Sequence, residues 1–237
     1  MGDCMDDFLL ALTILPGLAF VYYIYTLDKI EKEPMDLLVK LLGFGALSCI
    51  PIVIFELAFE KVILQPYFMP GSLEYIFIEA FIGVAAIEEF AKYYVLKKIT
   101  WTHPAFNYHF DAILYAVCVS MGFALLENFM YVLDGGVSTA LSRAVISIPG
   151  HGVFGIFMGI YYGNAKEHLH CMRRQQKDHS LRMALLVPTL MHGFYDFCIM
   201  TDDDFMMAIF FGFIAVLYFV AYQKVKRMSK EDHRIYY

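Results

Sequence analysis

Apolar runs long enough to cross a lipid bilayer recur from one end of this 237-residue chain to the other. A hydrocarbon core about 30 Å thick needs about 20 apolar residues in a helix, and the segments between the runs are too short for a separate soluble domain. Hydrophobic residues make up 59% of the sequence and charged residues 18%. The sequence therefore predicts an all-α, polytopic transmembrane helix bundle that forms a single membrane domain over residues 1–237.

About seven spans are expected. They are placed at 8–27, 35–59, 73–97, 110–133, 143–165, 182–200 and 205–223. Basic residues gather in alternate loops and in the C-terminal tail, whereas the opposite side carries only Lys61 and Arg143. The positive-inside rule then predicts an N-terminus outside the cell and a C-terminus in the cytoplasm. The apolar runs make the lipid bilayer the expected partner. Because the formal charge is −6 and the basic residues lie in loops and the tail, we expect no binding to nucleic acid.

Three charged residues interrupt the apolar run from Phe81 to Lys98: Glu88, Glu89 and Lys92. An ionised side chain near a bilayer centre costs about 2.5 to 3.5 kcal/mol, so such residues usually face a partner or a water-filled cavity. In a helix, Glu88 and Lys92 share one face and Glu89 points about 100° further round. The ammonium can offset one carboxylate and leave the other for chemistry. The alternative is a Glu/Lys pair near a helix end that snorkels to the headgroups.

Further intramembrane polar groups lie in the later spans: Glu127 and Asn128, His151, and His192 with Asp196. At a rise of 1.5 Å per residue, Glu127 lies about 9 Å below the outer end of its span, and His151 and His192 each about 12 Å below theirs. Glu88 and Glu89 come out about two turns deeper on the same estimate. We still expect one shared pocket.

Two imidazoles and a carboxylate can hold a catalytic metal. His151, His192 and Glu127 offer zinc three ligands and one open position, and Glu88 or Glu89 can act as general base on a bound water. This is the chemistry of hydrolysis.

The same residues also allow hydrolysis without a metal. A glutamate pair then activates water, while histidine and Asp196 or Asn128 stabilise the developing oxyanion. Two other classes of protein fit the pattern. A proton- or cation-coupled transporter uses intramembrane Glu, His and Lys as a relay, and a membrane scaffold uses them only to join helices.

The backbone near both histidines carries prolines and glycines. Pro149 precedes His151, and Pro188 lies one turn before His192, so we expect a kinked or loosened helix at each histidine. Gly155, Gly159 and Gly163 repeat at four-residue spacing. They predict a face that lets a neighbouring helix approach closely.

Several of these residues belong to motifs that follow one another in a fixed order. The motifs are Asp28-Lys-Ile-Glu-Lys-Glu-Pro34, Glu88-Glu-Phe-Ala-Lys92, Phe110-Asp-Ala, Gly122-Phe-Ala-Leu-Leu-Glu-Asn128, His151-Gly-Val-Phe-Gly155 and His192-Gly-Phe-Tyr-Asp196. Through them, most of the chain resembles the PrsW family of intramembrane proteases, within the superfamily that holds CAAX-processing and bacteriocin-processing membrane proteases.

The resemblance implies a protease in the bacterial plasma membrane that makes the first, site-1 cut in a single-span membrane protein, typically an anti-sigma factor, near its extracytoplasmic side. It assigns catalytic roles to Glu88, Glu89, Glu127, His151 and His192, with Lys92, Asn128 and Asp196 in support. The CAAX-processing relatives have histidine and asparagine where this chain has Glu127 and Asp196. The added acids favour a divalent metal, with zinc as the candidate, over the metal-free glutamate mechanism of those relatives.

Overall fold

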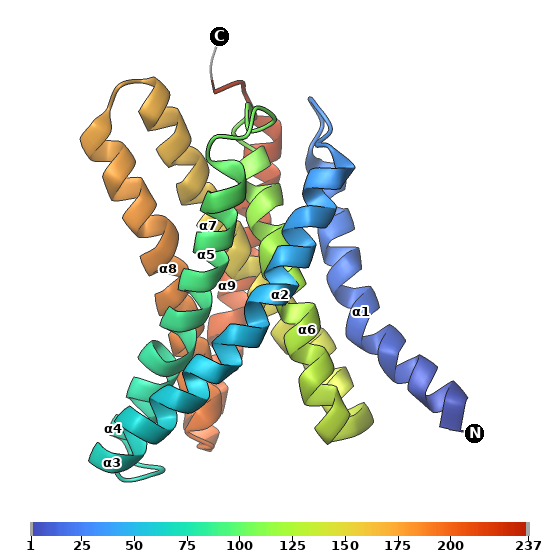
Figure 1. The fold of residues 1–237 in the computed structure, drawn as a ribbon, viewed down its shortest axis with the longest axis vertical. Helices are drawn as coiled ribbons and strands as arrows, with labels where there is room; N and C mark the ends of the chain where they lie inside the picture. Colours follow the sequence, from blue (N-terminus) through green and yellow to red (C-terminus); the bar gives the residue numbers. More distant parts are fainter. Residues whose placement is uncertain (1, 236–237) are drawn as a thin grey trace.

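The computed structural model describes residues 2–235, with side chains from residue 9 onward. Helices make up nearly all of this part of the chain, and long helices run along the length of the molecule (Figure 1). The elements are α1 (Gly2–Leu27), α2 (Met35–Phe59), η1 (Glu60–Leu64), α3 (Gln65–Tyr67), α4 (Leu73–Ile78), η2 (Glu79–Ala86), α5 (Ile87–Thr100), α6 (Asp111–Ser142), η3 (Arg143–Ser147), α7 (Ile148–His170), α8 (Arg174–Met200) and α9 (Asp204–Lys230). The predicted all-α class is confirmed.

Five helical stretches are long and apolar enough to cross a membrane: Leu9–Leu27, Met35–Tyr67, Asp111–His170, Arg174–Met200 and Asp204–Lys230. The stretch made of α4, η2 and α5 is not among them, because acidic residues and Lys92 interrupt it. The 60-residue stretch contains two helices that lie side by side, since the backbone leaves the helical conformation at Gly136 (φ 65°). The count of seven spans stays a prediction.

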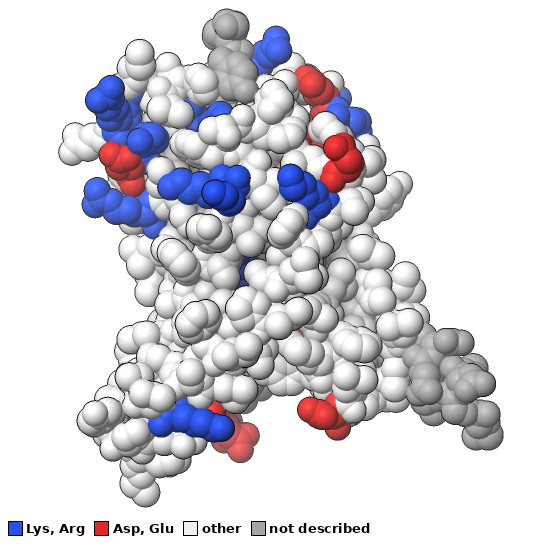
Figure 2. Space-filling view, viewed as in Figure 1, with Lys and Arg blue, Asp and Glu red and all other residues white. Residues whose placement is uncertain are grey.

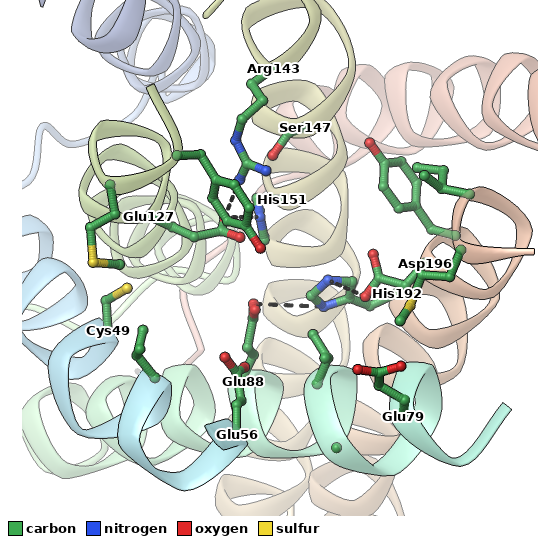
Figure 3. A pocket seen from close by; sticks show the side chains of 18 of the residues that line it. Cys49, Glu56, Glu79, Glu88, Glu127, Arg143, Ser147, His151, His192 and Asp196 are labelled. Carbon is green, nitrogen blue, oxygen red and sulfur yellow. Dashed lines mark hydrogen bonds and ion pairs between the residues drawn. The ribbon is translucent and has the colours of Figure 1, made fainter. Parts of the chain in front are cut away.

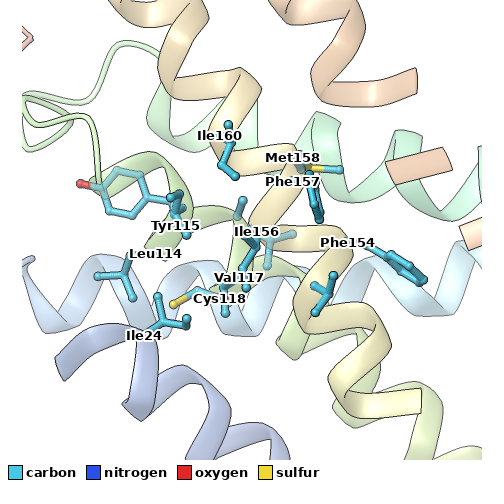
Figure 4. Packing of buried hydrophobic residues seen from close by; sticks show 14 of the residues in the cluster. Ile24, Leu114, Tyr115, Val117, Cys118, Phe154, Ile156, Phe157, Met158 and Ile160 are labelled. Carbon is cyan, nitrogen blue, oxygen red and sulfur yellow. The ribbon is translucent and has the colours of Figure 1, made fainter. Parts of the chain in front are cut away.

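Helices α6 and α7 form the centre of the bundle. Every residue of α6 from 111 to 124 is buried, and so is every residue of α7 from 150 to 160. Helix α6 packs against α1, α2, α5 and α7, while α7 also contacts α8 and α9. Figure 4 shows apolar side chains of both helices in one cluster that also includes Ile24 of α1. These two helices are therefore enclosed by protein, and the outer helices expose large apolar side chains such as Leu15, Phe55 and Phe219.

The glycine face predicted on α7 packs against α6. A Cβ atom added to Gly159 would lie 2.5 Å from the Cα atom of Ile113, and one added to Gly155 would lie 2.8 Å from the Ser120 hydroxyl oxygen. Gly163 continues this contact against Ala112. No larger side chain fits at Gly159 unless the helices separate. The predicted packing role of these glycines is confirmed.

Lysine and arginine side chains gather at one end of the molecule. Figure 2 shows them at the upper end, where the α7–α8 connection and the C-terminus lie, above a broad band of uncharged surface. This distribution matches the positions expected of basic loops on the cytoplasmic side. The orientation in the membrane stays a prediction.

Candidate active site

The Lys92 side chain is fully buried and lies between three possible metal-binding residues. Its ammonium nitrogen is 2.8 Å from Glu88 Oε2, 2.8 Å from Glu89 Oε1 and 3.1 Å from His151 Nδ1. The Phe123 ring lies under the same ammonium, 4.3 Å from it. Two buried carboxylates thus share one cation, which offsets the cost of removing their charges from water.

His192 joins the same group from α8. Its Nδ1 atom lies 3.1 Å from Glu89 Oε1 and 3.9 Å from Glu88 Oε2, and its Nε2 atom lies 3.2 Å from Asp196 Oδ2. The Phe154 ring stacks on the imidazole with the ring centroids 4.8 Å apart. The acids on both sides and the ring on its face hold this imidazole in one orientation.

His151 is held in a similar way from α6. Its Nε2 atom lies 3.0 Å from Glu127 Oε2, so its Nδ1 atom faces Lys92. The Arg143 guanidinium lies 2.7 Å from the same Glu127 oxygen, and its Nε donates to Asn128 Oδ1 at 2.6 Å. Each histidine therefore has one ring nitrogen against a carboxylate on the outside and the other turned toward Glu88, Glu89 or Lys92. We call Glu88, Glu89, Lys92, His151 and His192 the histidine cluster.

A cavity of about 760 Å³ opens on this cluster. Its lining includes Glu88, His151 and His192, together with Glu127 and Asp196 (Figure 3). Many of the other lining side chains are apolar and come from α2, α6, α8 and α9. Glu89 and Lys92 are fully buried behind this surface and do not line the cavity. The cavity suits an apolar chain that presents one polar group to Glu88 and the histidines.

The local backbone explains how these residues meet. Eight residues of π-helix, Glu79–Ala86, precede the turn that carries Glu88, and five more, Arg143–Ser147, precede the turn that carries His151. Such π-helical insertions shift the following side chains around the helix axis and are frequent at functional sites. On α8, Gly193 leaves room for Phe81, so that His192 comes close to the Glu88 turn. Pro188 is accommodated within a continuous helix.

The structure brings together all eight residues that the sequence singled out, but the estimated depth of two of them was wrong. Glu88 and Glu89 do not lie two turns below the histidines, because Glu89 and His192 are 3.1 Å apart. The estimate assumed straight helices that begin at one level. Instead, the α3–α4 end reaches beyond the lower end of α6 (Figure 1), and π-helix precedes Glu88.

Two residues of the site were missed from the sequence. Arg143 was treated as a loop charge at a span end, yet it pairs with Glu127 inside the cavity wall. Glu56, in the 35–59 span, lines the cavity, and Figure 3 shows it beside Glu88. The signal for Glu56 was available, since it is an acid within an apolar run just as Glu88 is. Asn128 does not line the cavity, because it accepts a hydrogen bond from Arg143 instead.

The histidine cluster contains residue types that bind metal ions, and the Lys92 ammonium contacts three of these residues, Glu88, Glu89 and His151. Glu88, Glu89, His151 and His192 each offer one ligand atom, and these four atoms lie within 4.8 Å of one another. Two imidazole nitrogens and carboxylate oxygens are ligands that zinc accepts. The hydrogen bond between His151 and Glu127 is of the kind that orients histidine ligands in metal sites, and Asp196 lies beside His192 Nε2 at 3.2 Å. Glu89 Oε2 is buried and has no hydrogen-bond partner, which leaves it free for a cation.

Comparisons with known proteins agree on one family. A protein-family model described as PrsW family intramembrane metalloprotease matches residues 33–223. A protein named Protease PrsW from Oceanobacillus iheyensis is 36% identical over 222 residues, which cover 94% of this chain and 96% of that protein. Proteins of the same name from Geobacillus kaustophilus and Bacillus subtilis are 32% and 31% identical, over 92% and 90% of this chain and 91% and 92% of their own lengths. No solved structure matches the chain.

Proposed function

Because the chain belongs to the PrsW family of intramembrane metalloproteases, we propose that its histidine cluster hydrolyses a peptide bond of a single-span membrane protein. As a family member, the protein is a multi-pass intramembrane peptidase of the cell membrane. The transporter and scaffold alternatives are therefore not retained. The substrate, the metal and the role of each residue belong to the proposal, as does the single domain over residues 1–237.

One observation carries the proposal. Four possible ligands from three helices, α5, α7 and α8, converge within 4.8 Å at the wall of a cavity that is otherwise largely apolar. Charged and polar side chains are expensive at membrane depth, so a group of this kind usually serves transport or chemistry. Membership of a protease family favours chemistry over transport.

Glu88 is the general base in this proposal, because it lines the cavity whereas Glu89 is buried behind it. The hydrogen bond from Lys92 holds the Glu88 carboxylate in place, and this carboxylate would accept a proton from the attacking water. As the carbon–nitrogen bond breaks, the same carboxyl gives that proton to the leaving amine. Glu89 lies behind the cavity wall and holds Lys92 and His192 in position through hydrogen bonds to both.

Arg143 is the group proposed to stabilise the negative charge that develops on the substrate carbonyl oxygen. Arg143 lines the cavity and is held by Glu127 and Asn128, so its guanidinium is fixed in place before substrate arrives. His151 and His192 are each held by one carboxylate, Glu127 and Asp196 respectively. Charge stabilisation by fixed groups typically provides a large share of the rate enhancement in such reactions.

Glu89, His151 and His192 would hold the metal, with Glu88 beside it. Glu127, which the sequence grouped with the ligands, contacts the far nitrogen of His151 and is proposed to orient that ligand. When bound, a zinc ion would polarise the substrate carbonyl and lower the pKa of water. The metal-free glutamate mechanism remains the alternative that metal analysis tests.

The substrate is proposed from the cavity and from the resemblance together. The apolar wall suits a transmembrane segment, and the charged groups suit one peptide bond exposed to water near the extracytoplasmic side. An anti-sigma factor cut at site 1 fits this description. Its identity rests on the family resemblance.

The test is cleavage of a single-span anti-sigma factor reconstituted with the purified protein in liposomes. The wild type is expected to release a shortened fragment, and Glu88→Gln is expected to release none at the same time points. Glu74→Gln, an exposed acid in α4, is the matched control and should cleave normally. Equal cleavage by Glu88→Gln and the wild type would exclude Glu88 as the base.

A further inference from the structure

Two motifs that the active site does not use meet at the opposite end of α6. Asp28 and Glu33 belong to the loop between α1 and α2, and Asp111 begins α6. One carboxylate oxygen from each of the three lies within 4.8 Å of the other two. Their exposed fractions are 1%, 3% and 0%. We call these three residues the acidic cluster.

The acidic cluster has no basic partner among the residues that the structure describes. No ion pair within 4.0 Å joins Asp28, Glu33 or Asp111 to a lysine, arginine or histidine in residues 9–235. Lys32, the nearest candidate in sequence, donates to the backbone oxygens of Tyr25 and Asp28 instead. The Lys32 charge acts on Asp28 from nearby, but no basic side chain forms an ion pair with the three buried carboxyl groups, which is costly unless protons or a cation neutralise them.

Two oxygens of the acidic cluster are left free by the hydrogen bonds around it. Asp111 Oδ2 accepts from the backbone N–H groups of Asn107 and Tyr108 at 3.0 and 2.7 Å, while Asp111 Oδ1 has no partner. Asp28 Oδ2 is also buried without a partner. The Tyr115 hydroxyl donates to Glu33 Oε2. Unpartnered buried oxygens on two different segments point to something else that binds between them.

Burial also raises the pKa of the two loop acids. The pKa of Asp28 rises to about 6 and that of Glu33 to about 7, in both cases mainly because burial disfavours the charged form. The raised pKa values reflect the cost of holding these carboxylates charged in a buried place, and a bound cation would offset that cost.

We propose that Asp28, Glu33 and Asp111 bind a hard divalent cation, Ca²⁺ or Mg²⁺, at the end of the bundle predicted to face the cytoplasm. The donors in this cluster are all oxygens, which these two ions prefer and which separates the site from the histidine cluster. The bound ion ties the α1–α2 loop to the start of α6.

The surroundings show what such an ion would stabilise. The chain just before α6 is held by the C-terminal segment, because Phe110 N–H donates to Asp232 Oδ1 at 2.9 Å and Ile235 N–H donates to the Asn107 oxygen at 2.8 Å. Because Asp111 follows this segment directly, a cation bound to Asp111 would also connect the C-terminal segment and the start of α6 to the α1–α2 loop. The site acts as a clamp on three separate parts of the chain, and it lies outside the cavity.

The test is thermal unfolding of the full-length protein in detergent at pH 7.5, after chelator treatment, with CaCl₂ or MgCl₂ added in steps. At about one hundred times the dissociation constant, the wild-type Tm should rise by roughly 5 to 10 °C. Glu33→Gln and Asp28→Asn should each lose most of that rise. Asp36→Asn, an exposed acid just inside α2, is the matched control and should keep it.

Three results would overturn the proposal. One is a wild-type Tm that neither cation changes. Another is a cation-induced rise in Tm that is as large in Glu33→Gln and Asp28→Asn as in the wild type. That result would show that the cation binds at another site, such as the histidine cluster. The last is a Tm that is higher at pH 5.5 than at pH 7.5 with no cation effect, which would show that protons alone neutralise the acidic cluster.

Discussion

The histidine cluster and the acidic cluster both bury carboxyl groups, but only the first contains its own positive charge. Lys92 lies 2.8 Å from both Glu88 and Glu89, and Arg143 lies 2.7 Å from Glu127. The acidic cluster has three acids and no basic partner within the described residues. One cluster is therefore charge-balanced by the fold itself, and the other depends on ions or protons from solution.

The surroundings of the two clusters differ as well. Glu88, His151 and His192 line a cavity of about 760 Å³, which gives a substrate access to them. None of the acidic cluster residues lines that cavity. The first cluster is open to a substrate through the cavity, whereas the second consists of three buried carboxyl groups between a loop and a helix. Similar residues are thus proposed to serve catalysis at one end of α6 and stability at the other.

The largest expected effect is the loss of catalysis in the histidine cluster. Glu88→Gln removes the proposed base and should lower the rate of substrate cleavage by about 10² to 10⁴-fold, since proton transfer by a positioned group contributes that much. Glu33→Gln, the same change in the acidic cluster, should leave the rate within about twofold at saturating cation. The rates are measured in liposomes. Comparable losses in both variants would remove the distinction between the clusters.

The second effect concerns stability. Lys92→Met removes the cation shared by Glu88 and Glu89 and should lower the free energy of unfolding by about 3 to 5 kcal/mol, because it leaves buried charges unpaired. Chemical denaturation in detergent measures this loss. Lys98→Met, at an exposed position of the same helix, is the control. An unchanged midpoint for Lys92→Met would show that another group balances the carboxylates.

A smaller effect is expected from the partner of His192. Asp196→Asn weakens the contact that orients the imidazole and should lower the metal affinity of the protein by about 10 to 100-fold. Competition with a chromogenic chelator measures the affinity. Asp178→Asn, at an exposed position of α8, should have the wild-type affinity. The same affinity in Asp196→Asn would mean that Asp196 has no part in the metal site.

The smallest effect is the contribution of the acidic cluster to the pH dependence of stability. Burial raises the pKa of Glu33 to about 7 from its ordinary value near 4.5, so the folded state holds the proton more tightly than the unfolded state. Its contribution to stability is full below about pH 4.5 and is lost as the pH rises through 7. The Tm of chelator-treated wild type should fall by a few degrees between pH 5 and 8. The fall should be shallower in Glu33→Gln, and an identical slope would contradict this assignment.

Much of the histidine cluster could be predicted from the sequence because charged residues are conspicuous in apolar runs. Glu88, Glu89 and Lys92 stood out in this way, and so did the histidines of the later spans. Arg143 did not, since a basic residue at the edge of a span is normally a loop charge. The depth of Glu88 could not be predicted, because a hydropathy pattern does not reveal where π-helix replaces α-helix.

The fold class and the close packing of the α7 glycine face followed from composition and spacing, whereas the identity of the neighbouring helix, α6, came from the structure. The acidic cluster did not. Its residues lie in a short loop and at a helix start, 78 positions apart at the closest, from Glu33 to Asp111. Nothing in local periodicity shows that these segments touch, because loop conformation depends on the helices that the loop connects.

The most direct test of this account is the metal content of detergent-purified protein, measured by elemental analysis in the wild type, His192→Ala and Glu33→Gln, each checked for folding. The account predicts about one zinc per chain in the wild type and in Glu33→Gln, and a loss of zinc in His192→Ala. Wild-type protein that is active without zinc or another transition metal, or zinc that is retained in His192→Ala, would contradict a metal centre at the histidine cluster.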